Sequence, residues 1–189
     1  KPVPGHEVAV VDQATGEELP PGEGGMLAVR RGDDPVVFQE YWNQPEKTAD
    51  ATLEAADGGD PWHLTEDLGY CDADGYYWFK ARDDDVIITS GYRVGPGEVE
   101  GAVLEHPSVE QVGVVGVPDV LRGEVIKAFV QPVAGVEGDD TLREELRDLV
   151  RDTLAKHEYP REIEFVDALP QTTTGKIQRR KLREGAGDH

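Results

Sequence analysis

Residues 81–100 read A-R-D-D-D-V-I-I-T-S-G-Y-R-V-G-P-G-E-V-E, and this stretch decides how the chain is divided. Three consecutive aspartates interrupt a pattern of strands that ends at Arg82. After them V-I-I-T-S predicts a new strand, and G-Y-R-V-G-P-G leads into a helix that begins near Pro96. We therefore place a domain boundary at Arg82–Asp83, which separates residues 1–82 from residues 83–189.

The part before this boundary is rich in strands and turns. H-E-V-A-V-V and M-L-A-V-R predict strands, and T-E-D-L-G-Y-C-D-A-D-G-Y-Y-W-F-K-A-R predicts two more around its D-A-D-G turn. P-E-K-T-A-D-A-T-L-E-A, from Pro45, predicts a short helix with proline near its start. These elements form an incomplete, strand-rich part of a domain.

The part after the boundary predicts a compact α/β unit of a common domain size. Two apolar strands, Q-V-G-V-V-G-V and V-I-K-A-F-V-Q-P, follow the helix at Pro96. Residues 140–157 form the clearest helix, with Asp139 or Asp140 as its cap and an apolar stripe that begins at Leu142. E-I-E-F-V predicts a final strand, and residues 172–183 predict a loop that runs into a basic helical end.

The charge of the chain excludes several partners. Nineteen Lys and Arg oppose 39 Asp and Glu, for a formal net charge of −20, and only seven of the cations are lysines. Such an excess of negative charge repels nucleic acids and anionic membranes at long range. An acid-rich, lysine-poor surface also fits a salty cytoplasm, where charge repulsion is screened.

Several other classes are excluded by features that the sequence lacks. No run approaches the ~18 apolar residues that cross a bilayer, and no signal peptide opens the chain. The single Cys71 excludes an internal disulfide and a cysteine-rich zinc site, and the five histidines are scattered, so we expect no bound metal and a cytoplasmic location. The chain opens K-P-V-P-G-H and its only methionine is Met26, so we expect a fragment of a longer protein.

Three groups of residues suggest chemistry, and each has a plain structural alternative. Asp67 could accept hydrogen bonds from the two hydroxyls of a ribose with Arg82 beside it, or it could simply cap a turn. Ser90 to Arg93, S-G-Y-R, could admit a ligand close to the backbone and present a planar fork to phosphate, or form an ordinary turn. The third group, T-T-T-G-K-I-Q-R-R-K-L-R, places five cations within eight residues of an acidic chain.

In this third group the glycine before Lys176 suits a turn that projects the ammonium outward. The segment lacks G-x-x-x-x-G-K-[ST] and is therefore not a phosphate-cradling P-loop. A solvated helix face explains the arginines about as well as an anion-binding site does. Nucleic-acid binding is a poorer interpretation, because the net charge opposes it and no aromatic residues lie within the cluster.

The order and spacing of the motifs are more specific than any one of them. T-E-D-L-G-Y-x-D-x-D-G-Y, then A-R-D-D-D-V-I-I-T-S-G-Y-R-V-G-P-G-E-V-E, E-H-P-S-V, G-V-P-D, R-G-E and P-Q-T-T-T-G-K-I-Q-R-R-K-L-R resemble the carboxyl-terminal third of acyl-CoA synthetases of the adenylate-forming ligase family, nearest to the medium-chain and acetyl-CoA types. The resemblance covers nearly the whole chain. It implies an α+β fold: a strand-rich, partial β-barrel-like subdomain at the end of the large AMP-binding domain (1–82), then the mobile, small α/β C-terminal domain (83–189).

The resemblance also implies roles for individual residues. Lys176 resembles the catalytic lysine of adenylation, and Asp83 the hinge about which the small domain turns. Arg93 matches a residue that meets the phosphate or acyl-adenylate. The nucleotide-binding positions are Asp67, Arg82, Phe79 and Lys176, with aromatic core packing as the alternative for Phe79. The CoA-binding positions are Ser90, Gly91, Tyr92, Arg122, Tyr159, Pro160 and Arg161, with a surface ion pair as the alternative for Arg122.

The implied reaction joins a small carboxylic acid to CoA at the expense of ATP, with Mg²⁺, in fatty acid metabolism. An ammonium at Lys176 would offset the repulsion between the carboxylate and the α-phosphate during adenylation. Two positions depart from the family pattern, because glycines are replaced by Glu66 and Ala81. The family's glycine- and threonine-rich phosphate loop and its acyl pocket are not in this sequence, so the fragment needs the missing N-terminal domain and is not expected to be fully active. Two alternatives stay open: an enzyme that loads a carrier-protein thiol, and a non-catalytic module that binds CoA or a partner.

Overall fold

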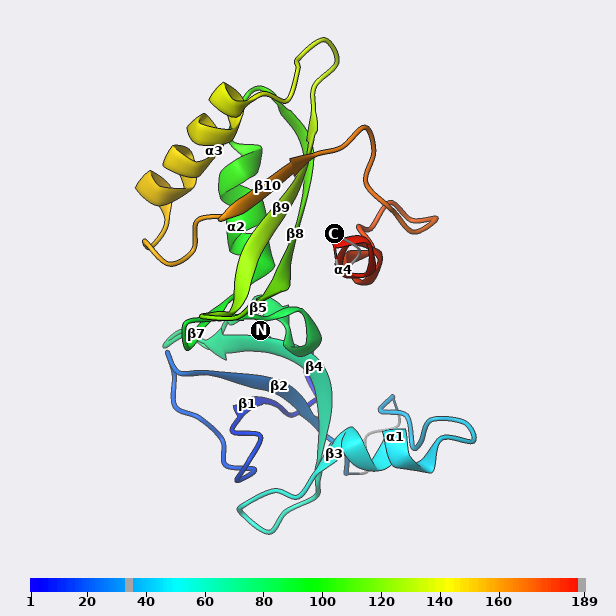
Figure 1. The fold of residues 1–189 in the computed structure, drawn as a ribbon. Helices are drawn as coiled ribbons and strands as arrows, with labels where there is room; N and C mark the ends of the chain where they lie inside the picture. Colours follow the sequence, from blue (N-terminus) through cyan, green and yellow to red (C-terminus); the bar gives the residue numbers. More distant parts are fainter. Residues whose placement is uncertain (33–35, 187–189) are drawn as a thin grey trace. The chain divides into compact units, whose positions relative to one another are not determined.

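The computed structural model describes residues 1–32 and 36–186. The chain forms two compact units, Lys1–Asp84 and Asp85–His189, which we call unit 1 and unit 2 (Figure 1). A short 3₁₀ helix, η1 (Asp83–Asp85), contains the point at which they divide. Both units contain a five-stranded sheet with helices, so the α+β prediction is confirmed.

The sheet of unit 1 is built around its longest strand. β4 pairs with β2 on one side and with both β3 and β5 on the other, and β1 pairs with β2, all antiparallel. The elements are β1 (Val8–Val11), β2 (Gly24–Arg30), α1 (Pro45–Asp50), β3 (Thr52–Leu53), β4 (Trp62–Cys71) and β5 (Tyr77–Arg82).

One face of this sheet carries a small core that includes Val11, Met26 and Trp62, each at most 2% exposed. The Tyr77 hydroxyl of β5 donates to the Val8 carbonyl of β1 at 2.6 Å, although two strands lie between β1 and β5 in the sheet. A flat sheet would keep these strands too far apart for this contact, so the sheet is curled. This curl is in keeping with a partial barrel. The helix predicted from Pro45 ends earlier than its pattern indicated, because residues 52–53 pair with β4 as a strand instead.

Unit 2 has a mixed sheet with a core on each face. β9 pairs along its length with β8, while its other edge is shared by β10, which runs parallel, and β6. The elements are β6 (Ile87–Thr89), β7 (Tyr92–Val94), α2 (Pro96–Leu104), β8 (Val109–Asp119), β9 (Gly123–Pro132), α3 (Asp140–Thr153), β10 (Glu162–Phe165) and α4 (Arg179–Ala186).

The two faces of this sheet are covered differently. α2 and α3 pack on one face, where side chains such as Val99 and Leu146 meet Val114 and Ile126. The other face meets Leu169 and Leu182, so α4 lies there (Figure 1). Because both faces are covered, β8 and β9 read as nearly continuous apolar runs rather than as alternating ones.

Two local predictions for unit 2 are corrected. Residues 92–94 form strand β7, not only a lead into the helix, because Ser90 and Gly91 both adopt positive φ (51° and 83°) and close a two-residue hairpin turn. The helix predicted over 140–157 ends at Thr153, because Leu154 takes an extended conformation.

The start of α3 has a defined cap: the Asp139 carboxylate accepts a hydrogen bond from the Leu142 amide at 2.8 Å. We expect Asp139→Ala to destabilise unit 2 by about 1 kcal/mol, because the amide loses its partner. Asp139→Asn is the matched control and should keep most of that stability. Urea unfolding followed by the helical circular dichroism signal measures both, and equal loss in the two variants would contradict the role of the cap.

Candidate functional site

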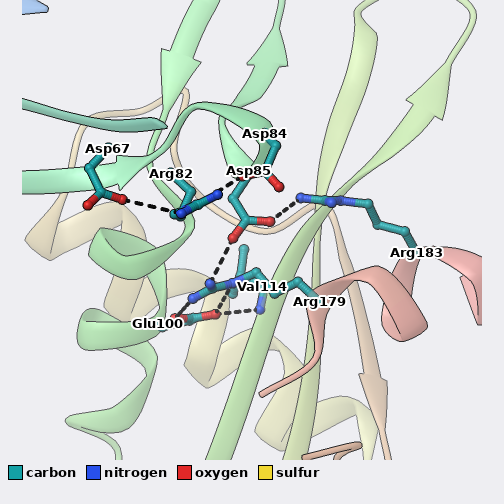
Figure 2. A network of polar contacts seen from close by, with 8 residues as sticks. All are labelled: Asp67, Arg82, Asp84, Asp85, Glu100, Val114, Arg179 and Arg183. Atoms are coloured by element: carbon teal, nitrogen blue, oxygen red, sulfur yellow. Dashed lines mark hydrogen bonds and ion pairs between the residues drawn. The ribbon is translucent and has the colours of Figure 1, made fainter. Parts of the chain in front are cut away.

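The predicted ribose-binding pair lies together in unit 1. Asp67 and Arg82 face each other across β4 and β5, with Arg82 Nη1 3.8 Å from Asp67 Oδ1 (Figure 2). Arg82 also pairs with Glu66, and its Nε lies 3.3 Å from Asp84 Oδ1. Burial acts to lower the pKa of Arg82, but hydrogen bonds with Asp84 and Glu66 outweigh it and raise the pKa above its usual value. Arg82 is therefore a charged, partly exposed group held by three carboxylates.

The two departures from the family pattern have different structural consequences. Glu66 adopts φ 64°, a left-handed conformation that glycine takes at little cost and glutamate does not. Ala81 is 5% exposed and faces Leu68 across the strand pair, so its methyl group is accommodated in the sheet. Glu66 therefore has a strained backbone conformation, and its carboxylate forms an ion pair with Arg82.

Phe79 lies on β5 opposite Gly69 and is 61% exposed. Core packing within unit 1, the alternative interpretation of this residue, is therefore wrong. A ring exposed on the strand that carries Arg82 is available to a ligand.

Replacing Glu66 separates the effect of backbone strain from the effect of the ion pair. Glu66→Gly and Glu66→Ala both remove the carboxylate, but only glycine relieves the left-handed conformation. We expect Glu66→Gly to be more stable than Glu66→Ala by roughly 1 kcal/mol in urea unfolding followed by tryptophan fluorescence, since all three tryptophans lie in unit 1. Equal stability of the two variants would show that the backbone at this position is not strained.

Lys176 lies in a small hairpin in unit 2, directly after the turn formed by residues 172–175. Gln171 and Ile177 form an isolated bridge at its base, the Thr172 amide donates to the Lys176 carbonyl at 2.8 Å, and Gly175 takes φ 82°. Lys176 is exposed, and within residues 1–32 and 36–186 no carboxylate pairs with its ammonium. The sequence predicted an outward-projecting lysine after a glycine turn, and the geometry has this form.

The neighbouring arginines are not a free cationic patch. Arg179 and Arg183 are partly buried; Arg179 binds Asp85 and Glu100, and Arg183 binds Asp85 (Figure 2). The exposed Arg180 pairs with Glu184 one turn along α4. The solvated-face interpretation is therefore wrong for Arg179 and Arg183, and the anions that they bind are carboxylates of the same unit. Sequence reasoning missed this cluster because its acidic partners lie 79 and 94 residues away from Arg179.

The predicted CoA-binding residues converge on one end of unit 2. The Ser90 amide donates to the Arg122 carbonyl at 2.9 Å, which joins the β6–β7 turn to the β8–β9 turn. Tyr92 stacks on His157 with ring centroids 4.0 Å apart, which brings the loop after α3 to the same place. Arg161 directly precedes β10; its amide donates to the Ile126 carbonyl, and its guanidinium lies 4.9 Å from the Tyr159 ring.

The remaining predicted residues of unit 2 differ in exposure. Gly91 and Arg93 are exposed, Arg122 is partly exposed, and Pro160 is buried beneath the surface, so its role is to shape the loop. No acidic partner of Arg122 is found in the described part of the chain, so the surface ion pair considered for it is absent there. Asp83, the predicted hinge, is exposed on η1. The two units divide between Asp84 and Asp85, two residues beyond the predicted boundary at Arg82–Asp83.

Two residues of this end were not predicted as site residues. Glu124 Oε2 accepts a hydrogen bond from the Ile88 amide at 2.8 Å and so ties the two turns together a second time. His157 supplies the ring beneath Tyr92. Glu124 belongs to the R-G-E motif noted in the sequence, whereas no motif in the sequence indicated a role for His157.

The described residues contain no cluster of three or more His, Cys, Asp or Glu side chains placed to hold a metal ion. None of the helices in residues 1–32 and 36–186 combines the length and apolar character needed to cross a bilayer.

Comparison with known proteins identifies the larger part of unit 2. Residues 98–176 match the AMP-binding enzyme C-terminal domain. The larger part of unit 2 is thus similar to the C-terminal domain of AMP-binding enzymes. The family resemblance drawn from the motifs is thereby confirmed.

Relatives of this AMP-binding C-terminal domain extend the match over both units. The chain is 49% identical to acetyl-coenzyme A synthetase of Bacillus subtilis and 45% identical to the mitochondrial acyl-coenzyme A synthetase ACSM3 of Rattus norvegicus, in each case over 97% of the chain and 31% of the relative. The crystal structure of ATP-bound MatB from Rhodopseudomonas palustris superposes with a TM-score of 0.85 at 36% identity, covering 98% of this chain and 35% of that one. The chain thus spans about a third of the length of the relatives it matches.

Proposed function

We propose that the chain is the C-terminal part of an ATP-dependent carboxylate–CoA ligase that forms an acyl-adenylate and then an acyl-CoA. Residues 1–82 would close the large AMP-binding domain, and residues 83–189 would be the mobile C-terminal domain. The observation that carries the proposal is the lysine of the T-G-K loop, held exposed directly after the turn of a hairpin, without a carboxylate partner in the described chain. The matched synthetases support the reaction class.

In the first half-reaction a carboxylate oxygen attacks the α-phosphorus of ATP, and pyrophosphate leaves. Two anions must meet, so an ammonium at Lys176 that bridges them lowers the barrier by stabilising the developing charge. In unit 1, Asp67 would accept hydrogen bonds from the ribose hydroxyls, with Arg82 and the exposed Phe79 beside the nucleotide. Arg93 would meet the phosphate of the acyl-adenylate. ATP would bind as its Mg²⁺ complex, with the ion counted as part of the substrate.

In the second half-reaction the thiolate of CoA attacks the acyl carbonyl, and AMP leaves. The surface formed by Ser90, Gly91, Tyr92, Arg122 and Tyr159–Arg161 would guide CoA. Arg122 and Arg161 would face its phosphate groups, because a guanidinium fork matches phosphate oxygens.

The geometry within unit 2 explains why such a domain would have to turn between the two steps. The Lys176 hairpin is attached near the start of β8, where the Gln171 amide group donates to Gln111. The Ser90–Tyr92 turn lies at the other end, beside Gly123. Gln111 and Asp119 are eight residues apart on one strand, a span of about 26 Å at 3.3 Å per residue. One active site cannot be contacted by both ends at once, so a hinge at Asp83 would present them in turn.

Lys176→Ala in the full-length ligase tests the adenylation role. We expect pyrophosphate exchange to fall by roughly 100- to 1000-fold, the usual effect of removing one transition-state donor, while thioester formation from supplied acyl-adenylate is kept. Lys181→Ala removes an exposed lysine five residues away and should leave both half-reactions unchanged. Equal retention of both half-reactions in Lys176→Ala would show that the assigned role is wrong.

Arg122→Ala tests the CoA surface. We expect the KM for CoA to rise by roughly 10- to 100-fold, because a charge-assisted hydrogen bond to phosphate is lost, with pyrophosphate exchange unaffected. Arg122→Lys keeps the charge without the fork and should fall between wild type and alanine. An unchanged KM for CoA would remove Arg122 from the site.

Two alternative functions can be distinguished from a CoA ligase by experiment. An enzyme that loads a carrier-protein thiol would leave free CoA unconsumed. A non-catalytic binding module would show no pyrophosphate exchange with any acid. A series of carboxylic acids in the exchange assay would also identify the acyl chain and test the expected place in fatty acid metabolism.

The net charge of −20 supports a cytoplasm rich in salt as the setting in which the protein works.

A further inference from the structure

Unit 2 contains an ionic cluster that connects three elements far apart in the sequence (Figure 2). Arg179 of α4 donates from Nη2 to Glu100 Oε2 at 2.7 Å and from Nη1 to Asp85 Oδ2 at 3.0 Å. Arg183, one turn further along α4, binds the other oxygen of Asp85. The carboxylates are the more buried partners, with side chains only 13% (Glu100) and 14% (Asp85) exposed.

Glu100 has a second task in this cluster. Its Oε1 accepts a hydrogen bond at 2.9 Å from the Val114 amide, which lies on the edge of β8 that does not pair with β9. The carboxylate therefore holds α2, α4 and the free edge of β8 together. Burial acts to lower the pKa of Arg179, but its hydrogen bond to Glu100 outweighs this effect and raises the pKa, so the arginine remains charged.

The cluster fixes one side of the Lys176 hairpin. Arg179 follows Lys176 by three residues, and between them Ile177 packs against the apolar cluster that contains Leu169 and Leu182. The Gln178 amide donates to the Pro170 carbonyl at 2.8 Å, which closes the base of the hairpin. The approach to β8 is close: a Cβ at Gly113 would lie 2.7 Å from Leu182 Cδ1 and 3.1 Å from Ile177 Cγ2.

The other end of the cluster lies at the division of the chain. Asp85 is the first residue of unit 2 and directly follows the residues in which the proposed hinge lies. Arg179 thus connects the base of the lysine hairpin to the first residue of unit 2 through a single guanidinium.

We propose that Arg179 is a positioning residue for adenylation: its fork on Glu100 and Asp85 fixes the base of the Lys176 hairpin relative to the start of unit 2. A hinge rotation then delivers the ammonium to a defined place, because the hairpin cannot shift against the segment that turns. The inference rests on the proposed role of Lys176. A displacement of about 1 Å at a reacting group can reduce a rate by about 100-fold, so a loose hairpin would be costly.

The first test measures both half-reactions in the full-length ligase. Arg179→Met should lower kcat for pyrophosphate exchange by up to about 100-fold with the KM for ATP little changed, and leave thioester formation from supplied acyl-adenylate intact. Arg180→Met is the matched control, because Arg180 is the adjacent exposed arginine and pairs only with Glu184 among the described acids. Adenylation that is unchanged in Arg179→Met, or lost equally in both variants, would overturn the proposal.

A double variant separates positioning from stability. Arg179→Met leaves Glu100 buried without its cation, whereas Glu100→Gln/Arg179→Met removes both charges and leaves Asp85 paired with Arg183. We expect the double variant to recover the wild-type unfolding midpoint but not adenylation, since the hairpin still lacks its anchor. If adenylation returns together with stability, Arg179 only stabilises the fold and the proposal is wrong.

The second test needs no activity and uses the 189-residue chain. Hydrogen exchange at the Thr172, Gly175 and Lys176 amides, all bonded within the hairpin, reports how firmly it is held. Exchange should be faster in Glu100→Gln/Arg179→Met than in Arg180→Met, and equal exchange would contradict the anchor. A Lys176→Ala ligase that keeps adenylation would instead refute the proposed function. The hydrogen-exchange result would still show whether Arg179 holds the hairpin, because it does not depend on activity.

Discussion

The long strand pair β8–β9 is the constraint on which unit 2 depends. Its residues are buried on both faces, by α2 and α3 on one side and by α4 with Leu169 on the other. A strand held in this way keeps a fixed length, so whatever is attached to its two ends stays about 26 Å apart. The lysine hairpin is attached near one end and the Ser90–Tyr92 turn at the other. The rigidity of one strand pair would therefore keep the two proposed sites, one for adenylation and one for CoA, apart within a single small unit.

The positively charged side chains of the two units have different surroundings. In a chain of net charge −20, arginines mostly bind carboxylates, as Arg82 does in unit 1 and Arg179 does in unit 2. Such pairs order the structure, because a partly buried carboxylate without a cation would be destabilising. Lys176 differs from them, since its hairpin carries it away from the acids of the described chain. An ammonium without a carboxylate partner among the described residues is available to a substrate anion, as is the guanidinium of Arg122.

The departure at residue 66 illustrates how a family pattern reflects backbone geometry. The position takes a left-handed conformation, for which glycine is the natural residue, and here a glutamate adopts it beside Arg82. The side chain adds a carboxylate to the pair proposed to hold ribose. The departure at Ala81 has no such effect, because that methyl group is buried in the sheet.

The sequence by itself determined most of the elements, the α+β class and the resemblance to the ligase family, because apolar periodicity and motif spacing are local properties of the chain. It also indicated an exposed lysine after a glycine turn, since turn chemistry depends on neighbouring residues. Helix ends were less predictable. Residues 52–53, which follow α1, form a strand because they pair with β4, and β4 begins only nine residues after Leu53. The tertiary structure alone decided that Arg179 pairs with Glu100 and Asp85, that Arg183 pairs with Asp85, and that His157 lies beneath Tyr92. Those contacts join residues 65 to 98 positions apart, and a pairing over such separations is set by how the sheets and helices pack, not by any pattern along the chain.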